Sequence, residues 1–223
     1  MEIQCLFMEN STKNYYQKSM IELDKMKRES KEFSICLHVC CGPCLTYPLE
    51  FLLQYFKNIV IVYNNSNIYP QREYQRRYEE LLNFIKVHNK ENEERITLIK
   101  FDYDNVSYNQ FLAQYGPQKE GNERCFACYE KRMEEVYKFA DEIGVDYFTT
   151  IMTISRQKNS QKLNEIGLRL QEKHKAKYFV SDFKKKKGID RKIELVKEYG
   201  MYNQEYCGCI YSYQEYLEKI RNK

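Results

Sequence analysis

Short apolar runs alternate along the chain with longer segments in which apolar residues recur every three or four positions. Residues 58–64, with the sequence NIVIVYN, are nearly continuous in valine and isoleucine, as in a parallel strand that is buried on both faces. Four further runs have the length and apolar character of strands. The pattern therefore predicts five strands, at residues 33–39, 58–64, 96–103, 147–154 and 178–181.

The segments between these runs have helical periodicity. Within residues 71–90, apolar side chains recur at Tyr74, Tyr78 and Leu81, which places them on one face of a helix. The same spacing occurs in six other segments. Helices are predicted at residues 14–28, 45–56, 71–90, 108–115, 124–143, 160–173 and 191–199.

Strands that alternate with helices pair in parallel, so the sequence predicts an open, mostly parallel α/β sheet. Residues 1–32 form an N-terminal helical leader in this prediction. Residues 33–223 form a single α/β catalytic domain that ends in a helical segment containing cysteines. Ligands of such sheets bind at the carboxyl ends of the strands, near the topological switch point. The sequence HVCCGPC, residues 38–44, follows the first predicted strand, so chemistry is expected there.

Composition narrows the class of protein. The 36 basic and 32 acidic residues leave a net charge of +4, too small to indicate nucleic-acid binding without a local basic patch. No apolar run approaches the roughly 20 residues that span a bilayer, and the N-terminus lacks the apolar core of a signal peptide. No membrane association and a cytoplasmic location are therefore expected. The nine cysteines, an odd number, then disfavour a disulfide framework and favour metal binding or catalysis.

Seven of the cysteines fall into three clusters, each at the edge of a predicted element. The clusters are Cys40, Cys41 and Cys44; Cys125 and Cys128; and Cys207 and Cys209. The second cluster opens a helix, where both sulfurs point to one side and the positive helix terminus stabilises thiolates. Gly208 allows the two sulfurs beside it to approach one site. Neighbouring residues of a strand point in opposite directions, so Cys40 and Cys41 either converge in the turn after the strand or bind different metals.

Seven thiols exceed the four that one zinc ion or one [4Fe-4S] cluster binds. The surplus indicates a second metal, a catalytic thiol or a redox pair. Zinc-stabilised folding and an iron–sulfur site are both compatible with the spacing, which differs from the common ferredoxin pattern. Cys36 lies within an apolar strand and is interpreted as a core residue, whereas Cys5 is interpreted as incidental.

Four sequence motifs together resemble the QueH-type epoxyqueuosine reductases. They are HVCCGPC, EYQRR at residues 73–77, ERCFACYEKR at 123–132, and DFKKKKGIDRKIELVKEYGMYNQEYCGCIYS at 182–212. The resemblance implies a Rossmann-like (nucleotide-binding-like) α/β fold and a [4Fe-4S] cluster with an adjacent second iron ion. It also implies two-electron removal of the epoxide oxygen from epoxyqueuosine at the wobble position of tRNA with a GUN-type anticodon, which gives queuosine. The electron donor is unknown.

The chain departs from the family pattern at two places. Residues 155–158 have the sequence SRQK where family members commonly have a Ser-Pro pair, and Asn203 stands where an arginine is usual. Both departures concern contacts with the substrate rather than the metal site.

The metal ligands expected from the resemblance are Cys40, Cys41, Cys125, Cys128, Cys207 and Cys209, together with Cys44. Which four hold the cluster is left open. Reduction of an epoxide also needs a proton donor, and Glu73, Asp182 and Tyr206 are candidates by position only. A surface or capping role is the alternative for each. His38 is either a proton donor or a hydrogen-bonded core histidine.

Two basic groups are candidate contacts to RNA phosphates. They comprise Lys184, Lys185, Lys186, Lys187 and Arg191, and, at the start of the helix after the second strand, Arg72, Arg76 and Arg77. An ordinary solvated face is the alternative for each group. With the resemblance, contact with tRNA is the favoured interpretation, and the wobble base must then be unstacked to be read.

Two other functions compete with the reductase. An ATP-dependent tRNA sulfurtransferase has a similar α/β fold but needs a phosphate loop rich in glycine or serine after the first strand. Here that position is Cys41-Gly42-Pro43-Cys44, and proline lacks an N–H donor. A zinc-stabilised RNA-binding module without catalysis is the other alternative.

Overall fold

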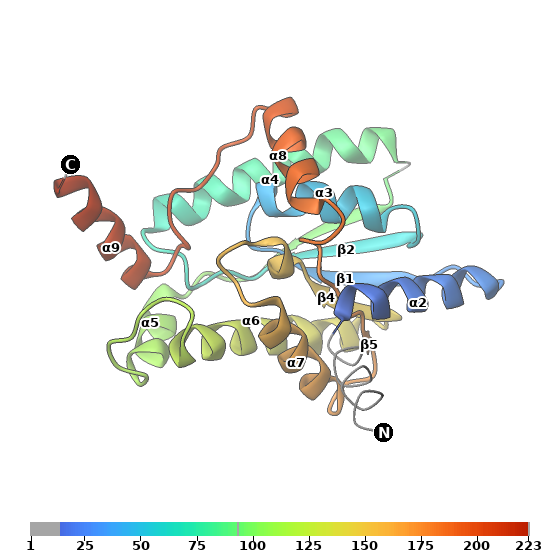
Figure 1. The fold of residues 1–223 in the computed structure, drawn as a ribbon, viewed down its shortest axis with the longest axis horizontal. Helices are drawn as coiled ribbons and strands as arrows, with labels where there is room; N and C mark the ends of the chain where they lie inside the picture. Colours follow the sequence, from blue (N-terminus) through green and yellow to red (C-terminus); the bar gives the residue numbers. More distant parts are fainter. Residues whose placement is uncertain (1–13, 93, 223) are drawn as a thin grey trace, which may run out of the picture.

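Five parallel strands form one sheet in the order β3-β2-β1-β4-β5 (Figure 1). The computed structural model describes residues 14–92 and 94–222. The observed sheet confirms the predicted open, parallel α/β fold. The strands are β1 (Ser34–His38), β2 (Asn58–Tyr63), β3 (Ile96–Lys100), β4 (Tyr147–Thr150) and β5 (Lys177–Tyr178).

Helices cover both faces of this sheet (Figure 1). One face carries α3 (Gly42–Leu52), α4 (Gln71–Glu91) and α8 (Gly188–Glu198), and the opposite face carries α5 (Asn105–Ala113), α6 (Glu123–Glu142) and α7 (Ser160–Gln171). The predicted leader helix is α2 (Tyr15–Arg28), and α9 (Ile210–Arg221) extends from the opposite end of the molecule. Among the residues described, no helix is long and apolar enough to cross a membrane.

Helix α2 packs onto the sheet through both apolar and charged contacts. Leu23 and Met26 are buried in the same hydrophobic core as the strands. The carboxylate of Glu22 pairs with Lys177 of β5, at 2.6 Å. Cys5, which the sequence marks as incidental, lies outside the described residues.

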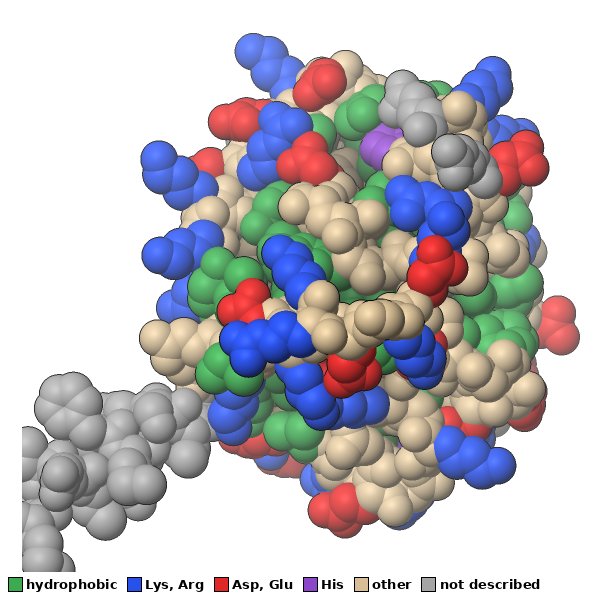
Figure 2. Space-filling view, turned by 90° about the vertical axis from the view of Figure 1, so that its right-hand side faces the viewer, with side chains coloured by type: hydrophobic (Ala, Val, Ile, Leu, Met, Phe, Trp, Pro, Cys, Tyr) green, Lys and Arg blue, Asp and Glu red, His purple; other side chains and the backbone are tan. Residues whose placement is uncertain are grey.

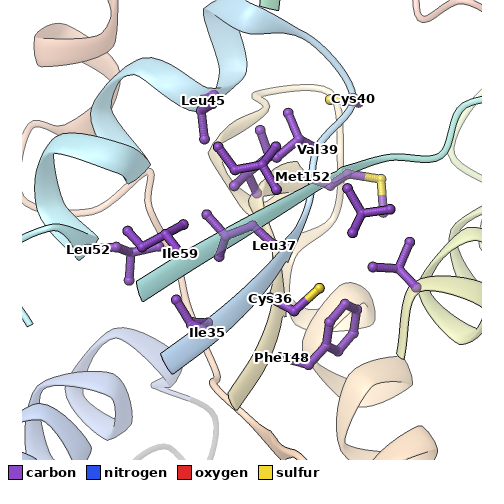
Figure 3. Close-up of a cluster of buried hydrophobic side chains, with 14 of the residues drawn as sticks. Ile35, Cys36, Leu37, Val39, Cys40, Leu45, Leu52, Ile59, Phe148 and Met152 are labelled. Carbon is purple, nitrogen blue, oxygen red and sulfur yellow. The ribbon is translucent and has the colours of Figure 1, made fainter. Parts of the chain in front are cut away.

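The central strand β1 is buried on both sides, as its apolar sequence predicts. Ile35, Leu37 and Val39 lie on the side that faces α3, and Cys36 lies on the other side beside Phe148 (Figure 3). Cys36 is completely buried, and this burial raises the pKa of its thiol. Its surroundings are those of a core residue.

Several predicted element boundaries are wrong: the strand predicted over 96–103 ends at Lys100, the helix predicted over 45–56 ends at Leu52, and the helices predicted from 108 and 191 begin at Asn105 and Gly188. Three other boundaries also differ, and side-chain hydrogen bonds explain two of these. Residues 151–154 form the 3-10 helix η1 (Ile151–Ile154) rather than the end of a strand, because the Thr150 hydroxyl accepts the Met152 N–H at 3.2 Å. Strand β5 ends early because the backbone of Ser181 bonds to the Asn164 amide of α7, at 2.8 and 3.0 Å, instead of a neighbouring strand.

The third boundary concerns the Gly-Pro pair after β1. It was predicted as a turn before a helix at residue 45, but it forms the first turn of α3, with Cys41 as the N-cap. Proline is tolerated there because the first N–H groups of a helix have no intrahelical partner. Cys44 therefore lies within the helix, one turn from its start.

The switch point of the sheet lies between the neighbouring strands β1 and β4, because the chain adds β2 and β3 on one side of β1 and then β4 and β5 on the other. The chain leaves β1 toward α3 on one face and leaves β4 through η1 toward α7 on the other. Loops therefore diverge at the carboxyl ends of these strands. Cys40 and Cys41 lie there, where a ligand site was expected.

Candidate metal centre

Three buried cysteines form the tightest group of thiols among the described residues. The Sγ atoms of Cys40, Cys41 and Cys44 all lie within 4.8 Å of one another, and those of Cys40 and Cys41 are 3.9 Å apart. Cys41 has an extended backbone as the N-cap of α3, and Cys44 follows in the first turn. The chain turns from strand into helix between them, so the two neighbouring sulfurs converge.

The thiols of this triad have pKa values that are shifted in opposite directions. Hydrogen bonds from Cys40 and Cys41 hold the pKa of Cys44 well below that of an ordinary thiol. The start of α3 adds to this effect, because a helix N-terminus stabilises a thiolate. Burial raises the pKa of Cys41. The three thiols therefore differ in how readily they lose their protons.

The other four clustered cysteines come together from two segments. Cys125 and Cys128 lie in the first turns of α6, and Cys207 and Cys209 lie just before α9. Burial raises the pKa of Cys125, and the charges of Cys207 and Cys128 raise it further. Burial and the charge of Cys207 raise the pKa of Cys209 to about 11. These thiols act on one another electrostatically, although their sulfurs are spread more widely than those of the triad.

Gly208 gives the last cysteine pair its shape. Its φ of +128° is in the region that glycine adopts without strain. A Cβ at this position would lie 3.0 Å from Nη1 of Arg77 and 3.1 Å from Ile68. Glycine is therefore required by both the backbone conformation and the close packing.

Arg77 and Glu73, both in α4, hold the loop that contains Gly208 in place. Arg77 is 2% exposed; its Nε pairs with Glu73 at 2.7 Å, and its Nη atoms donate to the carbonyl oxygens of Cys207 at 2.9 Å and Tyr206 at 3.0 Å. The Glu73 carboxylate also accepts the Tyr202 hydroxyl at 3.2 Å. Both predicted site residues are thus buried and engaged within the protein, although Arg77 also lines the cavity described below.

A buried arginine lies beside the thiols, and no carboxylate among the described residues pairs with it. Arg132 is 2% exposed, and its guanidinium contacts Asn65 Oδ1 at 3.3 Å, the Cys128 carbonyl at 3.3 Å and Met152 Sδ at 3.2 Å. Burial alone would lower its pKa, but the charges of the Cys128 and Cys40 thiolates raise it. An unpaired buried charge is costly, so this cation requires an anionic partner.

Lys158 supplies a second positive charge from the loop after η1. Burial would lower the pKa of this ammonium, and the negative charges of Cys207 and Cys40 outweigh that effect and raise it. No sequence pattern predicts this role, because Lys158 stands out only as part of the departure from the family pattern at residues 155–158. Cations on two sides of the thiols fit a centre that carries negative charge when its thiols are ionised.

A cavity of about 450 Å³ opens onto the thiols of Cys40, Cys44 and Cys207. Its wall is built from the loop after η1, from α8, and from the segment that contains Gln204 and leads into α9. Gln204 donates its side-chain amide to Cys41 Sγ at 3.2 Å and to Cys44 Sγ at 3.9 Å. No sequence pattern marked this glutamine beyond its position near Cys207.

Of the three predicted proton donors, only Tyr206 lines this cavity. Its hydroxyl donates to the Tyr69 carbonyl at 2.8 Å. Asp182 lies elsewhere, buried near Ser160 of α7, whose hydroxyl donates to it at 3.3 Å. His38 is completely buried, bonded to Thr150 Oγ1 at 3.0 Å, and burial lowers its pKa to about 3. It is therefore a neutral core histidine at physiological pH.

Some of the basic residues predicted to contact RNA interact with other groups of the protein. Arg191 pairs with Glu50 at 2.7 Å, Lys184 donates to the Lys158 carbonyl at 3.0 Å, and Arg76 stacks 3.3 Å from the Tyr202 ring centre. The exposed members of the predicted set are Arg72, Arg76, Lys185, Lys186 and Lys187.

Three further cations line the cavity and were not among the predicted contacts. They are Arg156, Lys192 and Lys219, and within the described part of the chain none of them forms an ion pair. Glu120, Glu205 and Glu215 also line the cavity, so charges of both signs occur there as well. The face shown in Figure 2 likewise has basic and acidic side chains interspersed. Cations without an ion-pair partner among the described residues are thus present at the cavity, beside acidic groups.

Comparisons with known proteins agree with the cysteine pattern. Residues 35–215 match the family model described as Epoxyqueuosine reductase QueH. The chain is 38% identical over 206 residues to Epoxyqueuosine reductase QueH of Streptococcus pyogenes, covering 92% of this chain and 80% of that one. It is also 38% identical to the protein of the same name from Staphylococcus aureus, covering 92% and 86%.

Acinetobacter baylyi has a relative of the same name at 32% identity, with 86% of this chain and 85% of that one aligned. A solved structure, the U34-tRNA thiolase NcsA from Methanococcus maripaludis with its [4Fe-4S] cluster, aligns at a TM-score of 0.49 and 12% identity over 92% of this chain and 73% of that chain. That likeness is too distant to support a functional argument. The family match covers all three cysteine clusters, and by this match the chain belongs to the epoxyqueuosine reductase QueH family of oxidoreductases.

Proposed function

We propose that this chain reduces epoxyqueuosine in tRNA to queuosine, by removing the epoxide oxygen as water with two electrons and two protons. One observation carries the proposal beyond family membership. Cys40, Cys41 and Cys44 lie within 4.8 Å of one another at the carboxyl end of β1. The buried cation of Arg132 has no carboxylate partner among the described residues, and the charges of Cys40, Cys128 and Cys207, one cysteine from each of the three clusters, raise its pKa. Thiolates that bind metal would provide the negative charge that this cation needs.

The spacing of the thiols supports a division of labour between them. Four ligands at about 2.3 Å around one tetrahedral ion lie about 3.8 Å from each other. The Cys40–Cys41 separation of 3.9 Å is close to this value. We therefore assign Cys40, Cys41 and Cys44 to the second iron ion. The remaining set, Cys125, Cys128, Cys207 and Cys209, has the four thiols that one [4Fe-4S] cluster binds.

When bound, the cluster supplies electrons one at a time, and the iron ion is a Lewis acid for the epoxide oxygen. The protein's own groups have separate tasks. Arg132 neutralises charge beneath the thiols, and Arg77 fixes the loop that presents Cys207. Tyr206 and Lys158 are the proton donors that we propose, because both line the cavity that opens onto the sulfurs.

Binding of tRNA is the second part of the proposal. Arg156, Lys192 and Lys219 would contact phosphates, together with the exposed lysines at residues 185–187. The rings of Tyr206 and Tyr216 are stacked 5.4 Å apart at the cavity. Unpaired RNA bases stack on aromatic side chains, so this pair offers a surface for bases displaced from the anticodon loop. The expected substrates are tRNAs with a GUN-type anticodon.

The decisive experiment is anaerobic purification followed by metal and activity analysis. We expect brown protein that contains iron and acid-labile sulfide, loses its visible absorption with dithionite, and converts epoxyqueuosine to queuosine in tRNA without ATP. Colourless protein with zinc and no sulfide would favour the zinc-stabilised RNA-binding module. An absolute ATP requirement would favour the sulfurtransferase, although Pro43 at the start of α3 removes an N–H from the place where a phosphate would bind.

Paired substitutions test the assignment of the thiols. Cys125→Ser is expected to lose sulfide together with most of the iron. Cys44→Ser is expected to lose about one iron per chain and to keep its sulfide. Loss of sulfide to the same extent in both variants would contradict the division between triad and cluster.

A further inference from the structure

Gln204 lies against two sulfurs of the cysteine triad. It lies in the segment between α8 and α9, which has no regular secondary structure. Its terminal nitrogen is 3.2 Å from Cys41 Sγ and 3.9 Å from Cys44 Sγ. Its Oε1 is buried and has no hydrogen-bond partner within the described part of the chain. A buried amide oxygen without a partner is costly, and therefore calls for an explanation.

The two distances match the fourth corner of a tetrahedron. An oxygen ligand at about 2.1 Å and a sulfur ligand at about 2.3 Å from one ion lie about 3.6 Å apart. The observed distances of 3.2 and 3.9 Å lie on either side of this value. The amide nitrogen and oxygen have nearly the same size, and a half turn of the amide exchanges their positions. After that turn, Oε1 lies at these distances from the sulfurs of Cys41 and Cys44.

We propose that Gln204 Oε1 is the fourth ligand of the metal ion held by Cys40, Cys41 and Cys44. The inference rests on the proposed function and deepens it. Three thiolates around a divalent ion leave one net negative charge, and a neutral amide adds no more. Lys158 lies on the same cavity wall to balance that charge.

This ligand would also be the exchangeable one. A neutral oxygen binds a metal more weakly than a thiolate does, and the Gln204 side chain lines the cavity of about 450 Å³ through which a substrate would enter. The three cysteines are buried at the end of β1 and in α3, and two of them, Cys40 and Cys44, border the same cavity. Catalytic metal sites keep one position open for exchange. A substrate oxygen that displaces Gln204 would therefore reach the ion from the cavity side.

A simpler role for Gln204 is to donate its N–H to a thiolate, and two substitutions separate the alternatives. Gln204→Glu keeps an oxygen at the same reach but removes the N–H donor and adds negative charge. If Gln204 is a ligand, the glutamate binds the ion more tightly than the glutamine does. If Gln204 is only a donor, the glutamate repels the thiolates and weakens the site. Gln204→Ala weakens the site in either case.

The test uses Co²⁺ as an optical probe for the triad. Anaerobically purified protein is treated with a chelator until it loses one iron per chain without loss of sulfide, and Co²⁺ is then titrated while the thiolate charge-transfer and ligand-field bands are recorded. We expect Gln204→Glu to bind Co²⁺ at least tenfold more tightly than the unmodified protein and to shift the ligand-field bands, and Gln204→Ala to bind about tenfold more weakly. Gln214→Glu and Gln214→Ala, on the exposed surface of α9, are matched controls and should change nothing.

Weaker Co²⁺ binding by Gln204→Glu, or unchanged bands in both variants, would overturn the ligand assignment and leave the glutamine as an N–H donor. Absence of thiolate bands in the unmodified protein would overturn the ion site itself. The reductase proposal is judged separately, by iron and sulfide content and by turnover of tRNA before chelation. The two failures are therefore distinguishable.

Discussion

Replacement of Arg132 by methionine should affect the metal-loaded protein and the metal-free protein differently. Methionine fills much of the same space but carries no charge. In the metal-loaded protein, the substitution removes the attraction between the Arg132 guanidinium and the negatively charged thiolates. This attraction is about 3 kcal/mol for charges roughly 5 Å apart at an effective dielectric constant of about 20. In the metal-free protein, burial raises the pKa of neighbouring thiols such as Cys207, so they are mostly protonated at neutral pH. Arg132 then has little counter-charge, and its replacement should be nearly neutral or stabilising.

The assay is denaturant unfolding of both proteins under anaerobic conditions, before and after removal of metal. For Arg132→Met, the loss of unfolding free energy measured without metal is subtracted from the loss measured with metal. The change in packing caused by the methionine contributes to both values and therefore cancels. Lys138→Met, on the same helix but with 61% of its side chain exposed, is the matched control and should give no difference. Equal destabilisation by Arg132→Met with and without metal would refute the argument, because the arginine would then serve only its hydrogen bonds and packing.

Three further outcomes follow from the structure. Cys36→Ala should keep its iron and sulfide and lose on the order of 1 kcal/mol of stability in denaturant unfolding, because it removes a buried sulfur that faces the core rather than the metal site. The pKa of His38 is lowered to about 3 in the folded protein, so the unfolded chain binds a proton below about pH 6.5 that the folded protein does not. Protonation of His38 in the unfolded chain should therefore lower the free energy of unfolding by about 2 kcal/mol between about pH 7.5 and pH 5. In metal-free protein, the decrease in unfolding free energy over this range should be smaller by about 2 kcal/mol for His38→Asn than for the unmodified protein. Lys192→Glu should weaken tRNA binding and flatten its salt dependence in filter-binding assays, whereas Lys197→Glu, on the same helix but outside the cavity, should have a much smaller effect.

Periodicity was enough to predict the sheet and its helices, because the signal lies in consecutive residues. The run at 58–64 became β2, and the spacing of apolar residues after Gln71 became α4. The errors arose where a contact with a residue distant in the sequence determines the end of an element. Strand β5 ends where Asn164 of α7 bonds the backbone of Ser181, and no local pattern contains that contact.

The candidate site was predictable in its chemistry but not in its internal arrangement. The cysteine clusters and their place at the end of β1 follow from spacing and from the rule for parallel sheets. One relation between polar residues was also present in the sequence. Glu73 and Arg77 are four residues apart in a helix, a spacing that favours an ion pair, yet they were assigned separate roles. Gln204 had no comparable signal, because its contact with Cys41 joins residues 163 positions apart.

The metal centre has a closed side and an open side, and this asymmetry decides how a large substrate can approach. On the closed side lie Arg132 in α6 and the neutral His38 in β1, both buried. On the open side, Gln204 and Lys158 line the cavity, together with the cations of α8 and α9. A folded tRNA cannot enter a cavity of about 450 Å³, so only a base that has left the stack can reach the sulfurs. We therefore expect the RNA to lie across the mouth of the cavity, between α8 at the top of Figure 1 and α9 at its left, rather than on the face in Figure 2. Charge reversals on the face in Figure 2 should then leave the affinity for tRNA unchanged.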